Sequence, residues 1–575
     1  MLLNSVLAGC IAAAYLTVLF LQLNPSIPMR LSSVGPLALV LLLSYGLHFG
    51  VVFYVAIVLR QMFVQDPLSP GWLSVRVLAW LGTAAASCGS IVMWLNLRGF
   101  RSSLQPEAAQ NMALGAAVLT AASVGFVVVA LVRRSVQPRW RLGAVLLAVL
   151  LVISVAGPLA LRGAAQPLER RTFHGESREA FAIPPADVRV TMLLVDGASL
   201  DFISPAAAAG RLPNFGRILD SGSVMHLATL RPTQPEPVWT AVATGKRPSK
   251  NGVRSASTYH VAPGGPSLDL LPDYCLAHGL VYFGFLDETP HSSSSVQART
   301  VWDLLTASGI SSVIVRWPLT FPARPLNGVL VSDQWHRAPG GTAAAGTVSA
   351  TYPRDLVSTL QPRIDAPAVQ TQQSIGGDGA PVDTLAGPHA LDRMYAEVFD
   401  ALRGSEPHQF LAVRYQGLDN VGHTFLRQAM PRSFGDVSEE ERRKYGRMLE
   451  TSYRYVDDEI GKAIADMGRD DLLLVVSAFG MEPVSLPKRA LERLLGDPRL
   501  TGTHERAPDG FLMAYGRSVR PGRLSRASVV DVTPTVLYFF GLPIGRDMDG
   551  YARTDIFSRA FTEERPLTFI PTYER

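Results

Sequence analysis

Cysteine is scarce in this sequence, which has three among its 575 residues. Cys10 and Cys88 lie within long apolar runs, and Cys275 stands alone in the rest of the chain, so a disulfide within that remainder is excluded. Charge is also sparse: charged residues make up 18% of the chain, and the formal net charge is +5. Because no dense run of Lys and Arg with interleaved aromatic residues occurs, the sequence argues against a nucleic-acid partner.

Charged residues are almost missing from five long runs within the first 162 residues. Each run is long enough to cross a bilayer, which takes roughly 20 residues. Five such runs in series are rare in a soluble core, so we expect a membrane domain of five transmembrane helices over residues 1–162 rather than buried core helices. The runs are Val6–Leu23, Val34–Leu59, Val77–Leu97, Met112–Val132 and Leu142–Leu161.

Arginines flanking the apolar runs predict an orientation. Arg133, Arg134, Arg139 and Arg141 crowd the short loop between the fourth and fifth runs. The positive-inside rule places that loop in the cytoplasm. With five crossings, the C-terminal part of the chain then lies outside the cytoplasm. We therefore expect a multi-pass integral membrane protein whose soluble domain is extracytoplasmic.

The remainder of the chain has the pattern of an α/β domain. A polar linker over residues 163–187 precedes the apolar run VRVTMLLVDG, and similar runs recur as SSVIVRW, FLAVRYQ and LLLVVSA. Near-continuous apolar runs are typical of parallel strands that are buried on both faces. Helical patterns alternate with them, as in ARTVWDLLTASG and the long stretch 441–468. We therefore expect an α/β domain over residues 188–575, with a mostly parallel sheet flanked by helices.

Polar side chains stand where several of these strands end. Asp196 closes the first strand, and LDNVGH places Asp419 and His423 four residues apart after another. Ligands in open α/β sheets bind beyond the carboxyl ends of the strands. Together with His504 in TGTHERAPDG, Asp419 and His423 form a plausible three-ligand set for a zinc-like ion with one position open.

Several motifs in order resemble the type I phosphodiesterase/nucleotide pyrophosphatase branch of the alkaline phosphatase superfamily. They are VDGASLD, PTQPEPVWTAVATGKRPSKNGV, ARTVWDLL, RWPLTFPARPLNGVLVSD, LDNVGH and VVDVTPTVLYFFGLPIGRDMDG, spanning about residues 188–555. The resemblance implies an alkaline phosphatase-like fold and two metal ions that clamp a phosphoryl group. It also implies that Asp419, His423 and His504 hold one ion, and that Asp196 would hold the second with a nucleophile and a further Asp-His pair.

The chain departs from that family pattern at the second ion. The nucleophile position falls on Pro235, which has no hydroxyl, and the second Asp-His pair is replaced by Ala478 and Phe479. Thr233 is a candidate nucleophile if the loop is shifted, and Glu236 is a possible substitute ligand or base. We therefore expect one divalent ion, Zn or alternatively Mn, and doubt a second; with one ion, an activated water could attack directly in place of Thr233.

Two hypotheses on function follow. The first is a membrane-anchored, metal-dependent phosphodiesterase or phosphotransferase-like hydrolase acting on a phosphorylated small molecule, lipid or glycan. Its layout resembles that of lipoteichoic acid synthases and phosphoethanolamine transferases, which points to a bacterial cell membrane and to the lipid bilayer as a partner. The second is a catalytically impaired pseudoenzyme that binds a phosphorylated ligand or a protein partner. Lys246 and Arg254 are either phosphate contacts or solvated loop charges.

Overall fold

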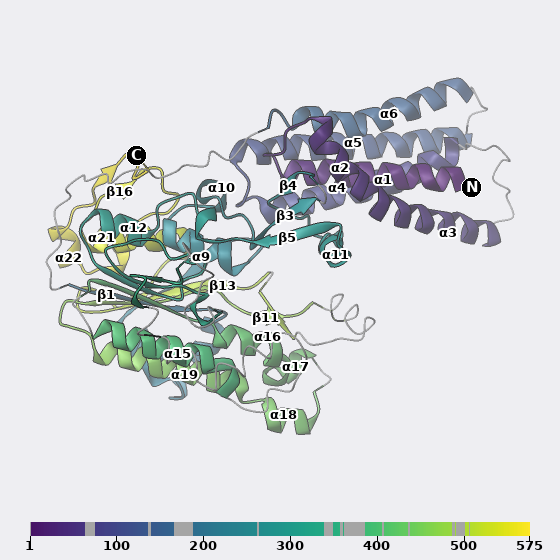
Figure 1. Cartoon of the computed structure of the whole chain (residues 1–575). Helices are drawn as coiled ribbons and strands as arrows, with labels where there is room; N and C mark the ends of the chain where they lie inside the picture. Colours follow the sequence, from purple (N-terminus) through teal and green to yellow (C-terminus); the bar gives the residue numbers. More distant parts are fainter. Residues whose placement is uncertain are drawn as a thin grey trace. The chain divides into compact units, whose positions relative to one another are not determined.

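The computed structural model contains two units (Figure 1). One comprises Met1–Arg170 and Arg254–Pro290, and the other comprises Arg171–Val253 and His291–Arg575. The structure describes residues 2–63, 75–135, 140–165, 188–261, 264–337, 349–356, 360, 386–404, 408–434, 437–485, 489, 501–504 and 506–574. Most of the expected linker, from residue 166 onward, lies outside the described residues.

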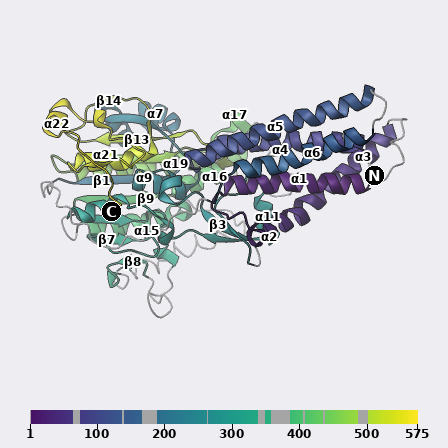
Figure 2. The same ribbon diagram turned by 90° about the horizontal axis from the view of Figure 1, so that it is seen from above.

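Among its described residues, the first unit contains five stretches that are long and apolar enough to cross a membrane, at the places expected from the sequence. They are Leu2–Leu23, Leu31–Phe63, Val77–Phe100, Pro106–Val132 and Gly143–Leu161. The second stretch is built from three helical pieces, α2 (Leu31–Leu41), the π-helical η1 (Leu42–Gly46) and α3 (Leu47–Phe63). The others are α1 (Leu2–Leu23), α4 (Val75–Phe100), α5 (Pro106–Ser135) and α6 (Trp140–Leu161), which lie side by side in Figures 1 and 2.

A short β-segment, Arg254–Pro290, groups with these helices, although the sequence-based division placed it in the α/β domain. It forms a three-stranded sheet in the order β4 (Ser267–Leu268), β3 (Ser257–Val261) and β5 (Leu286–Pro290), with the short helix α11 (His278–Tyr282). Tyr259 and Val261 share one apolar cluster with Phe20 and Leu37 of the helices. That shared core explains the grouping, because burial of apolar surface is the main driving force for packing.

The second unit is organised around a ten-stranded mixed sheet. Its order is β14-β2-β13-β10-β1-β9-β6-β7-β8, with β15 beside β2. Five neighbouring strands at the centre are parallel: β10 (Leu472–Phe479), β1 (Val190–Val195), β9 (Phe410–Tyr415), β6 (Ser312–Val315) and β7 (Gly328–Val331). The strands β13 (Asp509–Tyr515) and β8 (Thr351–Tyr352) run antiparallel to their neighbours, and β2 (Ser223–Ala228), β14 (Gly522–Arg523) and β15 (Ala527–Ser528) complete the edge. The expected α/β class with a mostly parallel sheet is confirmed.

Helices cover both faces of this sheet (Figure 1). One core lies between the sheet and α9 (Pro235–Thr244), α12 (Val301–Ala307) and α21 (Val532–Phe539). The other lies between the sheet and α7 (Leu200–Ala208), α8 (Pro213–Ser221), α15 (Ala386–Arg403), α16 (Gly417–Ala429) and α19 (Met448–Ala465). The long helical stretch expected over 441–468 is divided: α18 (Glu439–Tyr445) ends at Gly446, and α19 begins at Met448.

Candidate functional site

Asp419 and His423 lie on one face of α16, directly after β9. Residues four apart on a helix project from the same side, one turn from each other. Here His423 Nε2 lies 3.4 Å from Asp419 Oδ2. The Asp419 side chain is buried, whereas His423 is half-buried, so the pair reaches from the protein interior toward solvent.

A small antiparallel ribbon delivers His504 to the same point. The strand β12 (Gly502–Thr503) pairs with β11 (Glu482–Pro483), and His504 follows it. The rings of His423 and His504 have centroids 5.0 Å apart. One ligand atom from each of Asp419, His423 and His504 lies within 4.8 Å of the other two. The structure therefore brings together three side chains that are up to 85 positions apart (504 − 419).

Hydrogen bonds orient both imidazoles for ligation. His423 Nδ1 donates to the carbonyl oxygen of Gly502 at 2.8 Å, and His504 Nδ1 donates to that of Thr233 at 3.0 Å. A carbonyl oxygen can only accept, so each Nδ1 carries a hydrogen, and the lone pair of the corresponding neutral tautomer is on Nε2. Metal-binding histidines are typically held this way by a backbone carbonyl.

The third member of the cluster has an unused acceptor. Asp419 Oδ1 is buried and has no hydrogen-bond partner among the described residues. A buried carboxylate oxygen without a partner is costly, and a cation would satisfy it. One carboxylate and two imidazoles fit a zinc or manganese ion, so the donor set passes the chemical test for a metal site.

Close packing leaves little freedom around the cluster. Gly197 has φ +70°, and a β-carbon there would lie 2.8 Å from Asp419 Oδ1, so this turn after β1 requires glycine. Phe479 is fully buried, and its ring centroid lies 5.0 Å from that of His504. Phe479 therefore supports an imidazole by packing at a position where the family resemblance implies a metal ligand.

A buried carboxylate holds the first turn of α16. Asp392 accepts hydrogen bonds from the backbone amides of Gln416 and Gly417 at 3.1 and 2.8 Å, and it pairs with Arg316. Burial alone would raise the pKa of Asp392, but the combined effect of His389, Arg316 and the amide donors lowers it. Asp392 is thus a carboxylate that fixes the helix on which Asp419 and His423 stand.

Asp196, the fourth residue proposed as a metal ligand, does not join the cluster. Arg414 donates to Asp196 Oδ2 through Nη2 and through Nε at 3.0 Å. Trp239 Nε1 donates to Asp196 Oδ1 at 2.8 Å. A guanidinium and an indole already engage both oxygens of this fully buried carboxylate. In this arrangement Asp196 therefore has no oxygen left to bind a second ion.

Arg414 is a buried charge beside the cluster that reasoning from the sequence did not single out. It lies in β9, where all six residues are buried, and Asp196, Glu236 and Asp333 are near enough to act on its charge. Burial tends to lower the pKa of Arg414, but these carboxylates raise it, so the guanidinium is a permanent cation. The signal was present as one arginine within the apolar run FLAVRYQ, because a charge in a buried strand requires a partner.

The residues considered for nucleophilic attack are placed at the start of α9. Pro235 is the first residue of that helix and offers no hydroxyl. Thr233 is buried, its hydroxyl donates to the Leu230 carbonyl at 2.8 Å, and its own carbonyl accepts from His504. Burial raises the pKa of Glu236 in the first turn of α9. In this structure Thr233 serves the cluster through its backbone.

The two cations considered as phosphate contacts are engaged elsewhere. Lys246 Nζ lies 2.6 Å from Asp547 Oδ2 and 2.6 Å from Glu574 Oε1. Arg254 belongs to the helical unit, where its Nη1 lies 3.6 Å from Asp269 Oδ2. Neither therefore joins the three-residue cluster.

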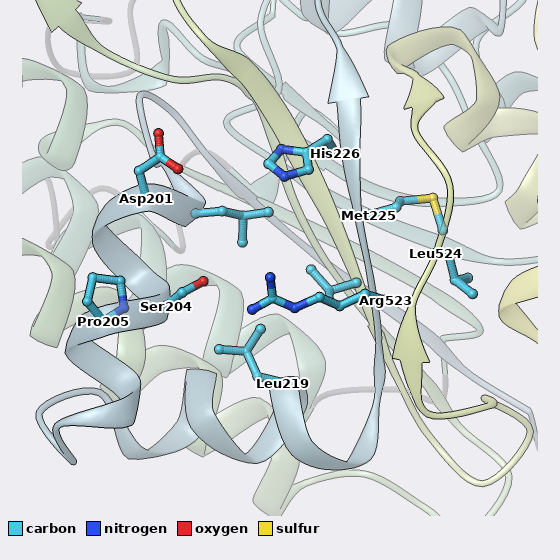
Figure 3. A pocket seen from close by; sticks show the side chains of 10 residues that line it. Asp201, Ser204, Pro205, Leu219, Met225, His226, Arg523 and Leu524 are labelled. Carbon is cyan, nitrogen blue, oxygen red and sulfur yellow. The ribbon is translucent and has the colours of Figure 1, made fainter.

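The second unit also contains a cavity of about 300 Å³. Figure 3 shows it between α7, α8 and the edge strands, with Asp201, His226 and Arg523 among its lining residues. None of the residues that line it belongs to the Asp419, His423 and His504 cluster. The convergent side chains, rather than this cavity, define the candidate site.

Several solved structures are similar to this chain at low sequence identity. Among solved structures, murine ectonucleotide pyrophosphatase/phosphodiesterase 5, in an inactive form in complex with AMP, is 12% identical, with a TM-score of 0.39 over 64% of this chain and 100% of its own. The human protein is 11% identical, with a TM-score of 0.38 over 66% and 99%. A mutant of the alkaline phosphatase PafA is 12% identical, with a TM-score of 0.40 over 66% and 100%.

No curated protein matches the sequence. A family model described as type I phosphodiesterase/nucleotide pyrophosphatase matches residues 190–528, which include Asp196, the β9–α16 segment and His504. This match covers more than half of the 575 residues and supports a phosphoric ester hydrolase. The chain therefore belongs to the type I phosphodiesterase/nucleotide pyrophosphatase family.

Proposed function

We propose that this protein is a membrane-anchored phosphoester hydrolase that depends on one divalent metal ion held by Asp419, His423 and His504. The observation that carries the proposal is their convergence, with ligand atoms within 4.8 Å of one another. Asp419 Oδ1, which has no hydrogen-bond partner among the described residues, and the Nε2 atoms of His423 and His504 supply the donors. Zn is the best fit to two nitrogens and one carboxylate, and Mn is the alternative.

The ion, when bound, would supply Lewis acidity toward a phosphoryl oxygen. The chain itself supplies a second, fixed positive charge in Arg414, which neutralises Asp196 beside the cluster. Burial raises the pKa of Asp196 and the nearby Asp419 carboxylate adds to this effect, whereas Arg414 opposes it. A permanent guanidinium thus takes the place that a second ion would have in a two-metal site.

The attacking group in this proposal is water. Pro235 provides no hydroxyl, and the Thr233 hydroxyl is buried and already donates to Leu230. Attack by Thr233 remains the alternative and would require this hydrogen bond to break. The two routes differ in outcome, because only a nucleophilic threonine forms a covalent intermediate.

The substrate is expected to be a phosphoester, consistent with the family and with the AMP complex of a solved relative. The five apolar helices favour substrates at a membrane, such as a phosphorylated lipid or glycan. The positive-inside rule, applied to the arginine-rich loop between the last two helices, puts the phosphodiesterase unit outside the cytoplasm, in our proposal of a bacterial cell.

A specific observation favours the second candidate, a pseudoenzyme that binds a phosphorylated ligand or protein without turnover. Both oxygens of Asp196 are engaged by protein donors, and the nucleophile position is a proline. Metal binding and turnover distinguish the two candidates.

The test uses the full chain in lipid nanodiscs. We expect about one equivalent of zinc or manganese per chain, the content of one three-ligand site. His504→Ala should lose it, whereas His226→Ala, an exposed histidine outside the cluster, should retain it. Two tightly held equivalents in the unmodified protein would contradict the single-ion site.

Turnover is then measured with an aryl phosphodiester. Hydrolysis that survives Thr233→Val but not His504→Ala supports water as the nucleophile. Loss of hydrolysis in Thr233→Val, with metal content intact, would instead identify threonine. A folded, metal-loaded protein without activity on any phosphoester would support the pseudoenzyme.

A further inference from the structure

The β-segment Arg254–Pro290 has a buried attachment to the membrane helices. Asn24 accepts from the backbone amides of Asp269 and Leu270 at 2.8 and 2.9 Å and donates to the Leu270 carbonyl at 2.9 Å. Asn96 pairs with the backbone of Asp273 in the same way, at 2.8 and 3.0 Å. Both asparagines are fully buried, so these bonds fix the segment on the helices.

Beyond this attachment the segment exposes an unusual concentration of apolar side chains. Tyr274, Leu276, Tyr282 and Phe283, here called the aromatic patch, are between 52% and 86% exposed. Tyr282 ends α11 and Phe283 follows it, whereas Leu280 of the same helix is buried. Among the described residues after residue 160, eight large apolar side chains are exposed, and half of them are these four. Contiguous exposed apolar surface marks an interaction site.

The second apolar stretch indicates where the patch lies along the helices. Leu31–Phe63 has 33 residues, or roughly 50 Å of helix, against a hydrocarbon core of about 30 Å. The 22 residues of η1 and α3 alone are about 33 Å long. Tyr45, near the start of that part, donates its hydroxyl to the Cys275 carbonyl at 2.8 Å. This bond ties the segment that carries the patch to the side of the second apolar stretch.

The segment that carries the patch also packs against that helix. Leu39, Leu43 and Leu47 on α2, η1 and α3 are exposed, while Leu37 and Leu41 pack in the same apolar cluster as Leu280 of the segment. Tyrosine and other aromatic residues are enriched where a membrane meets water, because their rings are apolar and their polar groups can face headgroups. The composition of the patch therefore fits that boundary.

We propose that the aromatic patch inserts into the headgroup–acyl boundary of the bilayer that the five helices cross. The partner is the lipid surface itself, and α11 lies at a shallow depth in it, beside the second apolar stretch. This inference rests on the membrane anchoring in the proposed function. It gives the phosphodiesterase chain a second membrane contact, from a segment inserted between two parts of the catalytic unit's sequence.

The test places an environment-sensitive fluorophore on single cysteines in the full chain in nanodiscs, after Cys10, Cys88 and Cys275 are replaced by alanine. Phe283→Cys reports on the patch. Val152→Cys, on an exposed face of α6, reports on the membrane span, and Tyr551→Cys, exposed on the other unit, reports on water. Nitroxide lipids labelled either near the headgroup or near the chain end serve as quenchers.

We expect the label at 283 to be quenched more by the shallow nitroxide than by the deep one, since an interfacial apolar face lies about 5–10 Å into the boundary. The label at 152 should show the reverse order, and the label at 551 should resist both. If 152 is not quenched, the membrane anchoring itself is refuted. If the label at 152 is quenched but the label at 283 behaves like that at 551, only the insertion of the aromatic patch is refuted. A blue-shifted but unquenched label at 283 would also overturn it, by showing a protein partner on the patch.

Discussion

Removing the guanidinium of Arg414 tests whether a fixed cation has replaced the second ion. Arg414→Met keeps an apolar stem of similar length but leaves Asp196 fully buried, with only the Trp239 indole as a donor. Deleting one partner of a buried ion pair costs about 3–5 kcal/mol, because the other charge is left uncompensated. We expect Arg414→Met and Asp196→Asn each to destabilise the phosphodiesterase unit by that amount.

The double variant separates pairing from general damage. Asp196→Asn combined with Arg414→Met removes both charges, so it should cost much less than the sum of the single changes. The coupling energy should lie near the upper end of the roughly 0.5–3 kcal/mol found for residues in contact. Denaturant unfolding of the full chain in nanodiscs, followed by tryptophan fluorescence, gives the midpoints. Single costs below about 1 kcal/mol, or strict additivity, would refute the argument.

A metal readout completes this test. The carboxylates of Asp196, Glu236 and Asp333 all raise the pKa of Arg414. Removing the guanidinium therefore leaves three carboxylates near one another without their shared positive charge. Added Mn²⁺ should therefore restore part of the stability lost in Arg414→Met, while Arg414→Lys, which keeps a charge, should respond less. An equal response from both variants would show that the carboxylates do not form a cation site.

Three further predictions concern neighbouring features. Gly197→Ala should reduce metal affinity at least about tenfold, because the new β-carbon would lie 2.8 Å from Asp419 Oδ1. Gly210→Ala is the matched control, since Gly210 also has φ +70° but lies in open space. Equal metal content in the two variants would contradict the predicted clash. Burial, with nearby arginines, lowers the pKa of His336 to about 3 from 6.5, so the unfolded chain binds the extra proton between these values and stability should fall as pH drops below about 6.5. His336→Gln should flatten that dependence in thermal unfolding at several pH values. Burial raises the pKa of Cys275 to about 12, so its thiol should resist maleimide at neutral pH in the folded chain and react after denaturation in detergent.

The strands and the three-residue cluster were accessible to sequence reasoning because their signals are local. Apolar runs predicted β1, β6, β9 and β10, and the four-residue spacing put Asp419 and His423 on one helical face. The ends of parallel strands meet at one edge of the sheet, which places Asp419 and His423 there. His504 follows the separate two-residue strand β12, and its place in the cluster was implied by the family resemblance.

The pairing of Arg414 with Asp196 was not accessible in this way. Local patterns show that a buried arginine needs a partner, but the partner is 218 positions away and depends on strand register. The grouping of residues 254–290 escaped prediction for a similar reason. The alternation through Tyr259 and Val261 predicts a strand with one buried face, but it does not say which unit supplies the opposing surface.

The division of the chain has a practical consequence for any attempt to isolate the catalytic unit. The backbone passes from one unit to the other three times, at residues 170–171, 253–254 and 290–291. A shortened protein starting at residue 188 would still carry Tyr259, Val261 and Leu268 without the Phe20 and Leu37 that cover them. Such a fragment should aggregate, whereas excising residues 254–290 and bridging the gap offers a route to a soluble enzyme.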